Sequence, residues 1–479
     1  MNVKGRKAKN QEFINNSIKN VVSQEELSRR KAEIKAGLKA FTWNELETNG
    51  KFAKNDKLSF ISDELLILGC DVGSETQYMR AIDIRGRELS REAFRFDNNF
   101  EGFESAKEWA LDIAAEYDKK QIVLGLEPTG HYWFCLAAWM ISNGISVVQV
   151  NPYAVKQTKE LEDNSQRKDD RKDPKLIANL VKDGNYGMPY LPEDLYADLR
   201  RLSMLRDQLS EDRIRYINRL HREMKIYFPE YMDAFGNVDG VFTLEILKEA
   251  PFPEDMLKLG ADGLREIWHK AGLRGRGYGR ADKIIELAEK SVGLTQGTAG
   301  SRMAVTYFVK QILALSEMIS ETEAELNVRS HEIPHAENLL EIDGIGETIL
   351  SGILAEMGDI ARFDDVKEIQ KLSGLGLVAC SSGKHKGETK ISHRGRKKLR
   401  YWLFQAAKSA VVHSEEFKTL HAYYTTRPDN PLKKMQSLIV IACKILRVIY
   451  TILKTGRKYD PVRMLSDIKH PTPAVTQAA

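Results

Sequence analysis

The sequence has few cysteines and little net charge, and both shortages narrow the possible classes of protein. Its 479 residues include only four cysteines, which stand far apart without paired spacing: Cys70, Cys135, Cys380 and Cys443. This pattern argues against a disulfide framework or a zinc site and is typical of a reducing cytosol. A formal net charge of +4 at pH 7 is too small to indicate a nucleic-acid partner, so local clusters of charge must decide that question.

Long hydrophobic runs are also missing. No apolar run approaches the length that spans a membrane, and the first residues, MNVKGRKAKNQ, lack the apolar core of a signal peptide. The most apolar stretch, Ser437 to Leu453, is interrupted by Lys444 and Arg447, which indicates a buried helix instead. With 42% hydrophobic and 29% charged residues, the composition predicts a soluble globular protein without a membrane partner.

The chain is too long for a single hydrophobic core, so we expect several domains. The predicted fold class is an α/β domain followed by mainly α structure. Changes in composition and periodicity divide the chain into five parts: an N-terminal extension at 1–63, a mixed α/β domain at 64–187, a helical coiled-coil region at 188–333 with an insertion at 236–300, a mainly helical C-terminal domain at 334–459, and a tail at 460–479.

The α/β part is organised around the apolar run Leu66–Gly69, which leads into Asp71. A short continuous apolar run of this kind predicts a buried strand. The first three strands are expected to form an antiparallel meander within a mixed sheet that has helices on its faces. Similar patterns predict the order βββαβαβα, with strands at 64–72, 78–86, 89–97, 121–127 and 146–150, and helices at 103–117, 131–143, 153–161 and 173–184.

Four acidic residues stand at positions that this topology brings together. Asp71 ends the first strand, Glu127 ends the fourth, and Asp170 and Asp173 lie three residues apart at a helix start. Ends of neighbouring parallel strands meet at one edge of a sheet. Four carboxylates there would repel one another unless cations lay between them, and hard oxygen ligands suit Mg²⁺, or Mn²⁺ as an alternative. Two such ions can clamp the attacking and leaving oxygens of a phosphodiester.

Other readings of these acids exist. A single aspartate at a strand end often caps a turn, Glu127 before a proline fits a solvated loop, and charge-rich stretches are usually solvated faces. Asp163 and Asp169 compete for the two helix positions, and Asp169 lies four residues before Asp173, which also gives a shared face. The convergence of all four acids on one predicted sheet favours the metal site.

The helical region carries two coiled-coil patterns. Apolar residues recur near heptad spacing from Leu195 to Tyr227. The second seam alternates by four and three. The two helices could pair with each other across the intervening insertion, or with another subunit. The residues of the second seam are Phe308, Ile312, Leu315, Ile319, Thr322 and Leu326.

A glycine- and serine-rich segment precedes a strongly basic one. Ser382 stands next to Gly383, where the backbone can approach a ligand closely, and Ser381 stands beside it. A serine hydroxyl is a weak nucleophile until a metal or base activates it, and serines in such loops are usually turn residues. The basic segment is the stronger signal, because clustered positive charge is typical of a phosphate-binding surface. Its residues are Lys384, Lys386, Lys390, Arg394, Arg396, Lys397, Lys398 and Arg400.

A second phosphate-binding candidate is the stretch that contains Gly344 and Gly346, directly before a predicted helix at 347–357. It is similar to the hairpin of helix-hairpin-helix modules, in which backbone N–H groups and a helix N-terminus hold a phosphate. A plain tight turn is the alternative.

Taken together, these motifs resemble the insertion sequence 110 family of transposases, the DEDD recombinases of mobile elements. The resemblance covers most of 64–187 and 334–455. It is carried by Gly69-Cys-Asp71-Val, Leu126-Glu127-Pro-Thr-Gly130, Val150-Asn-Pro152, Asp170-Arg-Lys-Asp173, Ile342-Asp-Gly-Ile-Gly346, Gly374-Leu, Ser382-Gly383-Lys and Arg394-Gly-Arg-Lys-Lys-Leu-Arg400.

The resemblance implies a RuvC-like, RNase H-fold domain whose acids Asp71, Glu127, Asp170 and Asp173 bind Mg²⁺, and a transposase domain whose Ser382 attacks DNA. It also implies a coiled coil between them and a bacterial-type, cytoplasmic, nucleoid-associated protein. Members assemble as homo-oligomers, here a dimer or tetramer, and use a structured element-encoded guide RNA to choose donor and target DNA. A composite site from acids and serine of different subunits is further implied.

Three positions depart from the family pattern. Val378 stands where a proline is usual, Asp169 where a threonine is frequent, and His393 where a lysine is frequent. None of these replaces a proposed catalytic group. Two other functions remain open at this point: a metal-dependent, structure-selective DNA nuclease of the Holliday-junction-resolvase type, and a non-catalytic nucleic-acid-binding scaffold.

Overall fold

The computed structural model describes residues 23–40, 54–128, 130–162, 173–273, 279–378, 381–382, 385–386 and 390–465. It divides the chain into two compact units, Met1–Leu191 and Pro192–Ala479. Each unit has its own hydrophobic cores and is presented separately below. Most of the predicted N-terminal extension, at 1–22 and 41–53, lies outside the described residues.

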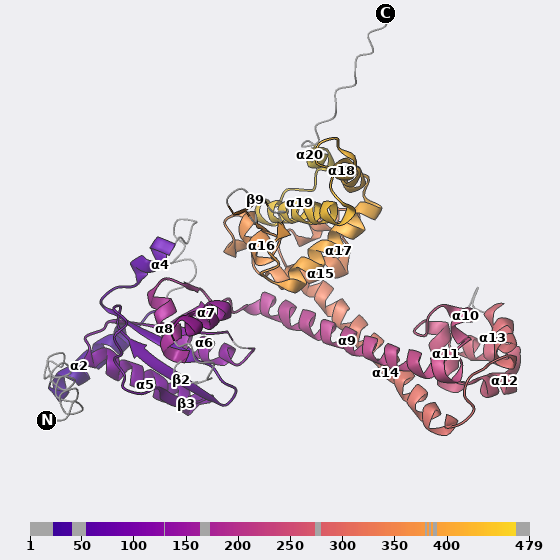
Figure 1. Cartoon of the computed structure of the whole chain (residues 1–479), viewed down its shortest axis with the longest axis horizontal. Coiled ribbons are helices and arrows are strands. Elements are labelled where there is room, and N and C mark those ends of the chain that lie inside the picture. The colour runs from indigo at the N-terminus through magenta and orange to yellow at the C-terminus, as the bar shows by residue number, and fades with distance from the viewer. Residues whose placement is uncertain are drawn as a thin grey trace, which may run out of the picture. The chain divides into compact units, whose positions relative to one another are not determined.

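The first unit is built on a six-stranded mixed sheet in the order β3-β2-β1-β4-β5-β6. β1, β2 and β3 form the predicted antiparallel meander, whereas β1, β4 and β5 run parallel. With its helices this is the mixed, RNase H-like architecture that the sequence predicts (Figure 1). The strands are β1 (Leu65–Asp71), β2 (Thr76–Ile82), β3 (Phe94–Asp97), β4 (Gln121–Leu126), β5 (Ser146–Val150) and β6 (Tyr186–Gly187).

The structure corrects three details of the predicted strand order. β2 ends at Ile82 rather than at 86, because the Asp83 carboxylate accepts hydrogen bonds from the N–H groups of Arg85 and Arg87 and turns the chain. β3 begins at 94 rather than at 89. Before it, Glu88 forms an isolated antiparallel bridge with Ile82. β6 was not predicted, since two residues are too short to show a hydrophobic period.

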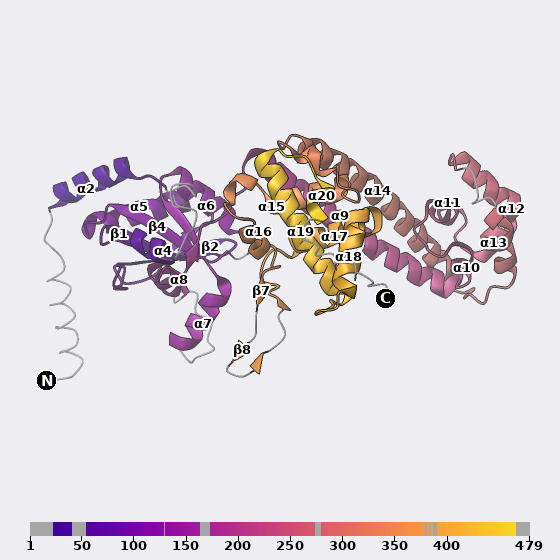
Figure 2. The ribbon, with the colours of Figure 1, turned by 90° about the horizontal axis from the view of Figure 1, so that it is seen from above.

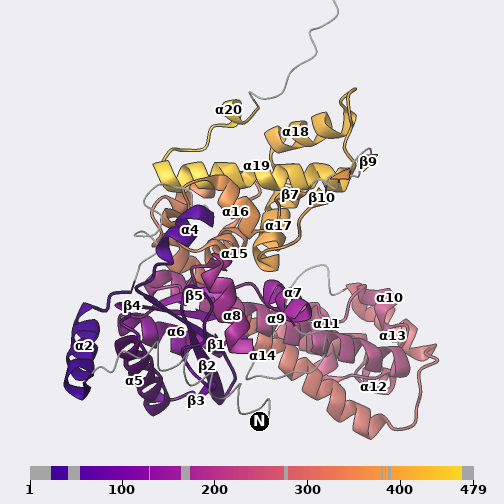
Figure 3. The ribbon, with the colours of Figure 1, turned by 60° about the vertical axis from the view of Figure 1, so that its left-hand side comes forward.

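Helices cover both faces of this sheet. Even-numbered residues of β1 face α5 (Phe100–Glu116) and α6 (Trp133–Ser142), and odd-numbered ones face α7 (Pro152–Glu162) and α8 (Asp173–Lys182). This follows from the period of two in a strand. On the first face α2 (Gln24–Gly37) packs against α5 (Figure 3), and α4 (Lys54–Phe60) precedes β1.

The second unit begins with a pair of long helices, α9 (Asp194–Tyr227) and α14 (Thr298–His331), which we call the arm. They lie side by side and antiparallel (Figures 1 and 2). Arg213 Nε donates to Ser316 Oγ at 2.9 Å, and the rings of Tyr216 and Tyr307 lie 5.9 Å apart. Of the two predicted alternatives, the seams therefore pair with each other within the chain.

Between these helices the predicted insertion forms a helical knob at 231–289. Its helices close around fully buried Trp268 and Tyr231, and the indole N–H of Trp268 donates to the carbonyl oxygen of Phe242 at 2.8 Å. The helices are α10 (Tyr231–Phe235), α11 (Val241–Glu249), α12 (Pro253–Lys270) and α13 (Arg280–Glu289).

The C-terminal part of the second unit is mainly helical, as predicted. The helix predicted at 347–357 is confirmed. The region predicted as a tail, 460–479, begins with a short helix that buries Met464; residues 466–479 lie outside the described part. The helices are α15 (Glu347–Met357), α16 (Val366–Leu372), α17 (Lys397–His413), α18 (Glu415–Thr426), α19 (Lys434–Thr455) and α20 (Pro461–Leu465), with short 3₁₀ turns at Ala336–Leu339 and Ile360–Arg362.

α19 is the one described helix whose length and composition would allow it to cross a membrane. In the structure it lies in the C-terminal core, where Ile441, Ile445 and Ile449 are almost completely buried. Core helices of this kind pass the same test of length and composition. The predicted buried helix at 437–453 is thus confirmed.

Candidate active site

Two glycines on neighbouring strands form the surface against which α8 packs. Gly69 of β1 pairs with Gly125 of β4. A Cβ atom added at Gly69 would lie 1.9 Å from the carbonyl oxygen of Pro174 and 2.6 Å from the amide nitrogen of Ala178, so the helix backbone itself touches the strand. At Gly125 the same atom would lie 2.4 Å from a methyl group of Val181. The missing side chains let α8 cross the sheet closely and place its first residue, Asp173, near the strand ends.

Asp71 and Glu127 stand next to each other on the same face as these glycines. Cys70 pairs with Leu126 in the parallel ladder, Asp71 ends β1 and Glu127 directly follows β4. Each acid lies two residues after its glycine, so a period of two directs both carboxylates to the α8 face. The prediction that parallel strands bring these two acids together is therefore confirmed by the register.

The pKa of Glu127 indicates that three acidic side chains lie close together. Burial raises the pKa of its carboxyl above the usual range, and the negative charges of Asp71 and Asp173 raise it further. The ammonium of Lys159 acts in the opposite direction. The charges of Asp71 and Asp173 therefore both reach the carboxyl group of Glu127.

Lys159 is the residue of this site that the sequence did not reveal. It lies on α7, and its Nζ atom is 2.7 Å and 3.0 Å from the two carboxylate oxygens of Asp173. Both side chains are largely buried, with 26% and 16% of their surface exposed. The helix at 153–161 was predicted, but nothing in its sequence distinguishes Lys159 from Lys156, which is exposed on the same helix.

The donor chemistry of Asp71, Glu127 and Asp173 fits a hard divalent cation, because all three supply carboxylate oxygens. Within the described residues, no three acidic, histidine or cysteine side chains lie closely enough together to hold a metal ion. The predicted fourth ligand, Asp170, and its rivals Asp163 and Asp169 all lie in 163–172, outside the described residues. Their place in the site stays a prediction.

The predicted nucleophile belongs to a different part of the chain. β8 (Ser381–Ser382) pairs antiparallel with β9 (His385–Lys386), so that Ser382 stands opposite His385. Further out, β7 (Leu377–Val378) pairs with β10 (Lys390–Ile391). The predicted glycine-rich loop thus contains two short nested ladders, which we call the serine hairpin (377–391); β7 and β8 are labelled in Figure 2.

The base of the serine hairpin is held by basic residues. Arg400 Nη1 donates to the carbonyl oxygens of Ser373 at 2.9 Å and His393 at 3.3 Å. Arg396 Nη1 donates to the carbonyl oxygen of Glu356 at 2.5 Å. A Cβ at Gly395 would lie 2.3 Å from the carbonyl oxygen of Leu372, which fixes the same junction. These guanidinium groups therefore bind backbone carbonyl groups and hold the base of the serine hairpin in place.

The other predicted nucleic-acid ligands differ in their surroundings. Lys398 Nζ lies 2.9 Å from a carboxylate oxygen of Asp207 on α9, so this ion pair partly neutralises its charge within the protein. Lys390, Arg394 and Lys397 are exposed. Lys384 lies outside the described residues, and Lys386 is described only as part of β9. Contact of this group with nucleic acid stays a prediction.

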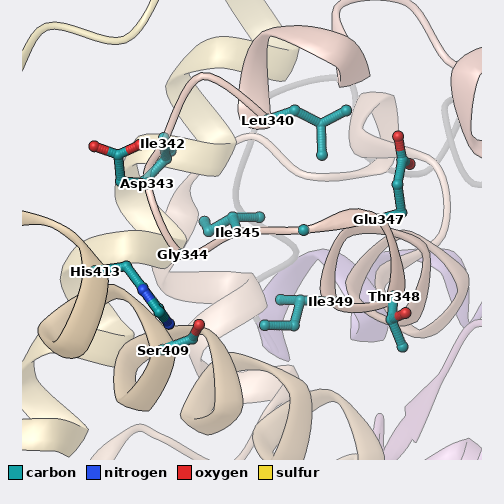
Figure 4. A pocket seen from close by; sticks show the side chains of 11 residues that line it. Leu340, Ile342, Asp343, Gly344, Ile345, Glu347, Thr348, Ile349, Ser409 and His413 are labelled. Carbon is teal, nitrogen blue, oxygen red and sulfur yellow. The ribbon is translucent and has the colours of Figure 1, made fainter. Parts of the chain in front are cut away.

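The predicted helix-hairpin-helix element forms a hairpin against α17 (Figure 4). Gly344 has φ = +93°, and a Cβ there would lie 2.8 Å from backbone atoms of Ala410, so a glycine is needed for close packing. Gly346 is the N-cap residue of α15, with open space around its Cβ position and no side-chain cap. Both line a cavity of ≈ 510 Å³ with Ser409 and His413 on its far wall. A phosphate there stays a prediction.

Comparisons with known proteins agree with this organisation. Residues 68–229 match a family model of the DEDD type described as "Transposase", and residues 336–424 match the model described as "Transposase IS116/IS110/IS902 family". The two matches contain the sheet with its acids and the serine hairpin, and the helical knob lies between them.

Three relatives illustrate the similarity. The insertion element IS116 44.8 kDa protein of Streptomyces clavuligerus is 24% identical over 86% of this chain and 98% of its own length. The insertion element IS900 42 kDa protein of Mycobacterium paratuberculosis is 26% identical over 61% of this chain and 73% of its own. The pilin gene-inverting protein of Moraxella lacunata is 24% identical over 76% of this chain and 89% of its own.

Proposed function

Because the chain belongs to the IS110/IS116 family of transposases, we propose that it moves a mobile DNA element by a serine-dependent strand transfer in which its acidic site takes part. The observation that carries this proposal is the pairing of Asp71 and Glu127 at adjacent strand ends, with Asp173 brought to them by α8. A structural sheet edge would not need three carboxylates, two of which raise the pKa of the third.

The proposed ligands of the divalent cation are Asp71, Glu127 and Asp173, with Asp170 as the fourth. Mg²⁺ is the proposed ion, and Mn²⁺ offers the same oxygen preference. Once bound, such an ion neutralises developing charge on the phosphodiester and makes an attacking hydroxyl more acidic. The contribution of this chain is to hold the carboxylates on a rigid sheet, which keeps them in place while the DNA reacts.

In the proposed reaction the Ser382 oxygen attacks the phosphorus of a DNA phosphodiester. A P–O bond forms, the bond to a deoxyribose oxygen breaks, and the serine proton is passed on so that the DNA leaves as a free hydroxyl. A hydroxyl of the partner DNA strand then attacks the phosphoserine, which releases Ser382 and rejoins the DNA. The covalent link conserves the energy of the phosphodiester, so that no nucleotide cofactor is required.

The proposal also assigns partners. Exposed Lys390, Arg394 and Lys397 near the serine hairpin would attract the DNA backbone. Assembly as a homo-oligomer and guidance by an element-encoded RNA are proposed on the resemblance of the motifs to the family. In such an assembly the serine of one subunit would act with the acids of another.

One experiment tests the chemistry. The full-length protein is incubated with element-end DNA, candidate RNA and Mg²⁺, and protein covalently attached to DNA is measured on denaturing gels. We expect an adduct that is lost in Ser382→Ala and retained in the matched neighbour Ser381→Ala. The adduct should also fall at least about a hundredfold in Asp71→Asn, as expected when an electrostatic catalytic group is removed.

The second candidate function, a structure-selective nuclease, makes the opposite prediction. If water is the nucleophile, DNA cleavage survives Ser382→Ala and still requires Asp71. A protein that binds DNA without cutting it, whether or not Asp71 is replaced, would be the non-catalytic scaffold.

A further inference from the structure

An ammonium group already occupies the cation-binding side of Asp173. Lys159 Nζ lies 2.7 Å and 3.0 Å from its two carboxylate oxygens, so both oxygens face the same lysine. The lysine side chain is 26% exposed and the aspartate side chain 16%, so water screens this ion pair only in part. The interaction is accordingly stronger than that of an ion pair on an open surface.

The pair connects the two helices that flank 163–172. Lys159 lies near the end of α7, and Asp173 is the first residue of α8. α7 and α8 pack against each other, and buried Val155 of α7 joins the core beneath α8. The backbone positions of both partners are therefore fixed by packing, and the lysine side chain is the part that can move.

A divalent cation that binds the two oxygens facing Lys159 would compete with this ammonium for Asp173. Mg²⁺ requires carboxylate oxygens at about 2.0–2.1 Å in nearly octahedral geometry, and it repels a positive charge held on the same carboxylate. Lysine carries a compact charge on a flexible four-carbon stem, so it can swing away without any change of the backbone. Glu127 is within reach of the charge of both Lys159 and Asp173, so the exchange changes the field at the whole acidic site.

We propose that Lys159 is a resident counter-cation of the acidic site, which holds Asp173 in the metal-free protein and is displaced when a divalent cation binds. This inference rests on the proposed function, because it takes Asp173 as a metal ligand. It makes Lys159 a positioning residue that lowers the affinity of the site for metal and keeps Asp173 oriented until the metal arrives.

The direct test measures Mn²⁺ binding to the full-length protein without DNA, from the electron paramagnetic resonance signal of free Mn²⁺. Removal of the competing charge in Lys159→Met should tighten binding by about tenfold. Lys159→Arg, which keeps the charge, should bind Mn²⁺ no more tightly than the wild type. Lys156→Met, on the same helix but exposed, is the matched control and should leave the affinity unchanged. Unchanged or weaker binding in Lys159→Met overturns the proposal.

A measurement on the wild-type protein does not depend on how the variants fold. An amine held on a carboxylate acetylates slowly, so adding Mg²⁺ should increase the acetylation of Lys159 several-fold, as followed by peptide mass spectrometry, while Lys156 stays constant. Equal labelling of Lys159 with and without Mg²⁺ contradicts the displacement.

Asp173→Asn separates this inference from the proposed function. If Asp173→Asn abolishes Mn²⁺ binding while Lys159→Met leaves it unchanged, the acidic metal site stands and the role of Lys159 falls. If neither variant changes Mn²⁺ binding, Asp173 is not a ligand and both fall.

Discussion

At Gly69 the backbone of α8 lies so close to the sheet that no side chain fits between them. The nearest atoms belong to the helix backbone, at 1.9 Å and 2.6 Å from the position of a Cβ, so a rotamer change cannot relieve the clash. The same residue thus controls both the packing of α8 and the position of Asp173. The sequence alone shows Gly69 but does not show that α8 packs directly against it.

Gly69→Ala should push α8 away from β1. We expect a loss of about 3 kcal/mol in the free energy of unfolding, as for an overpacked core, together with weaker Mn²⁺ binding. Urea unfolding followed by circular dichroism measures the first and metal titration the second. Gly187→Ala, in β6 of the same sheet with nothing within 4 Å of the added atom, is the control. Equal stability of Gly69→Ala and the wild type would refute the close approach.

The raised pKa of Glu127 predicts a pH-dependent effect of Glu127→Gln. A carboxyl whose pKa is higher in the folded than in the unfolded protein contributes stability at acidic pH and loses it as the pH rises through the folded pKa. In the presence of a chelator, Glu127→Gln should therefore melt a few degrees higher than the wild type at pH 7. The difference should vanish below the usual pKa range of carboxyl groups.

Differential scanning fluorimetry at several pH values measures this effect. Added Mg²⁺ should stabilise the wild type more than Glu127→Gln, because the amide removes a charged ligand. Exposed Glu92→Gln is the control and should behave as the wild type at every pH. A lower melting temperature of Glu127→Gln at pH 7 without metal would contradict the assigned electrostatics.

Among the elements, the serine hairpin depends on contacts made at its base. Arg400 joins Ser373 and His393, which lie at the two ends of the segment that contains the hairpin. The basic run was predicted to bind phosphate, and the structure gives Arg396 and Arg400 an organising role within the chain as well. One guanidinium nitrogen of Arg400 serves both carbonyl oxygens.

Arg400→Met should loosen the serine hairpin without unfolding α17, since Leu399 and Leu403 remain buried in the core. Cleavage within 377–391 by a non-specific protease should become about tenfold faster, as for a segment that opens more often. Mass spectrometry of the fragments locates the cut. Lys408→Met, on the exposed side of the same helix, serves as the control. An unchanged cleavage rate would mean that the hairpin is held by its own strand pairing.

A buried ion pair joins the arm to the C-terminal helices. Arg200 of α9 contacts the carboxylate of Glu356 of α15, whose side chain is 4% exposed. Nearby, Arg206 lies 4.5 Å above the ring of Trp402. Removing one partner of a buried pair leaves the other charge uncompensated.

Glu356→Gln should cost about 2 kcal/mol of stability, below the usual range for a buried pair because Arg200 is 28% exposed. Chemical unfolding provides the measurement. Glu266→Gln breaks the exposed pair with Lys270 and should change the stability much less, because water screens this pair. Similar losses in the two variants would show that burial does not strengthen the Arg200 contact.

The elements that the sequence predicted well are those with a clear period. β1, β4, β5 and α15 appear close to their predicted bounds, and the shared edge of Asp71 and Glu127 follows from a register that parallel strands impose. β6 was missed because two residues carry no period, and the ladders of the serine hairpin because glycine and serine show no apolar alternation. Lys159 was missed because its role depends on the packing of α7 against α8, which no local pattern encodes.

In the whole molecule, the acidic residues and Ser382 belong to different compact units, Met1–Leu191 and Pro192–Ala479. The first unit has complete cores on both faces of its sheet, so a fragment spanning 23–191 should fold cooperatively and bind Mn²⁺ through its acids. It should form no covalent adduct with DNA, because it lacks Ser382. Circular dichroism and metal titration measure these properties, with the Asp71→Asn fragment as the control. A fragment that fails to fold would show that the units stabilise each other.

The antiparallel arm has a consequence for protein engineering. Because α14 returns along α9, the chain leaves the arm and re-enters it at the same end, and the helical knob at 231–289 is attached there. The knob also lies between the two family matches, which end at 229 and resume at 336. This end of the arm is therefore a graft point: a foreign domain with adjacent termini could replace the knob if it also covers Leu220 and Met224, which the knob now buries.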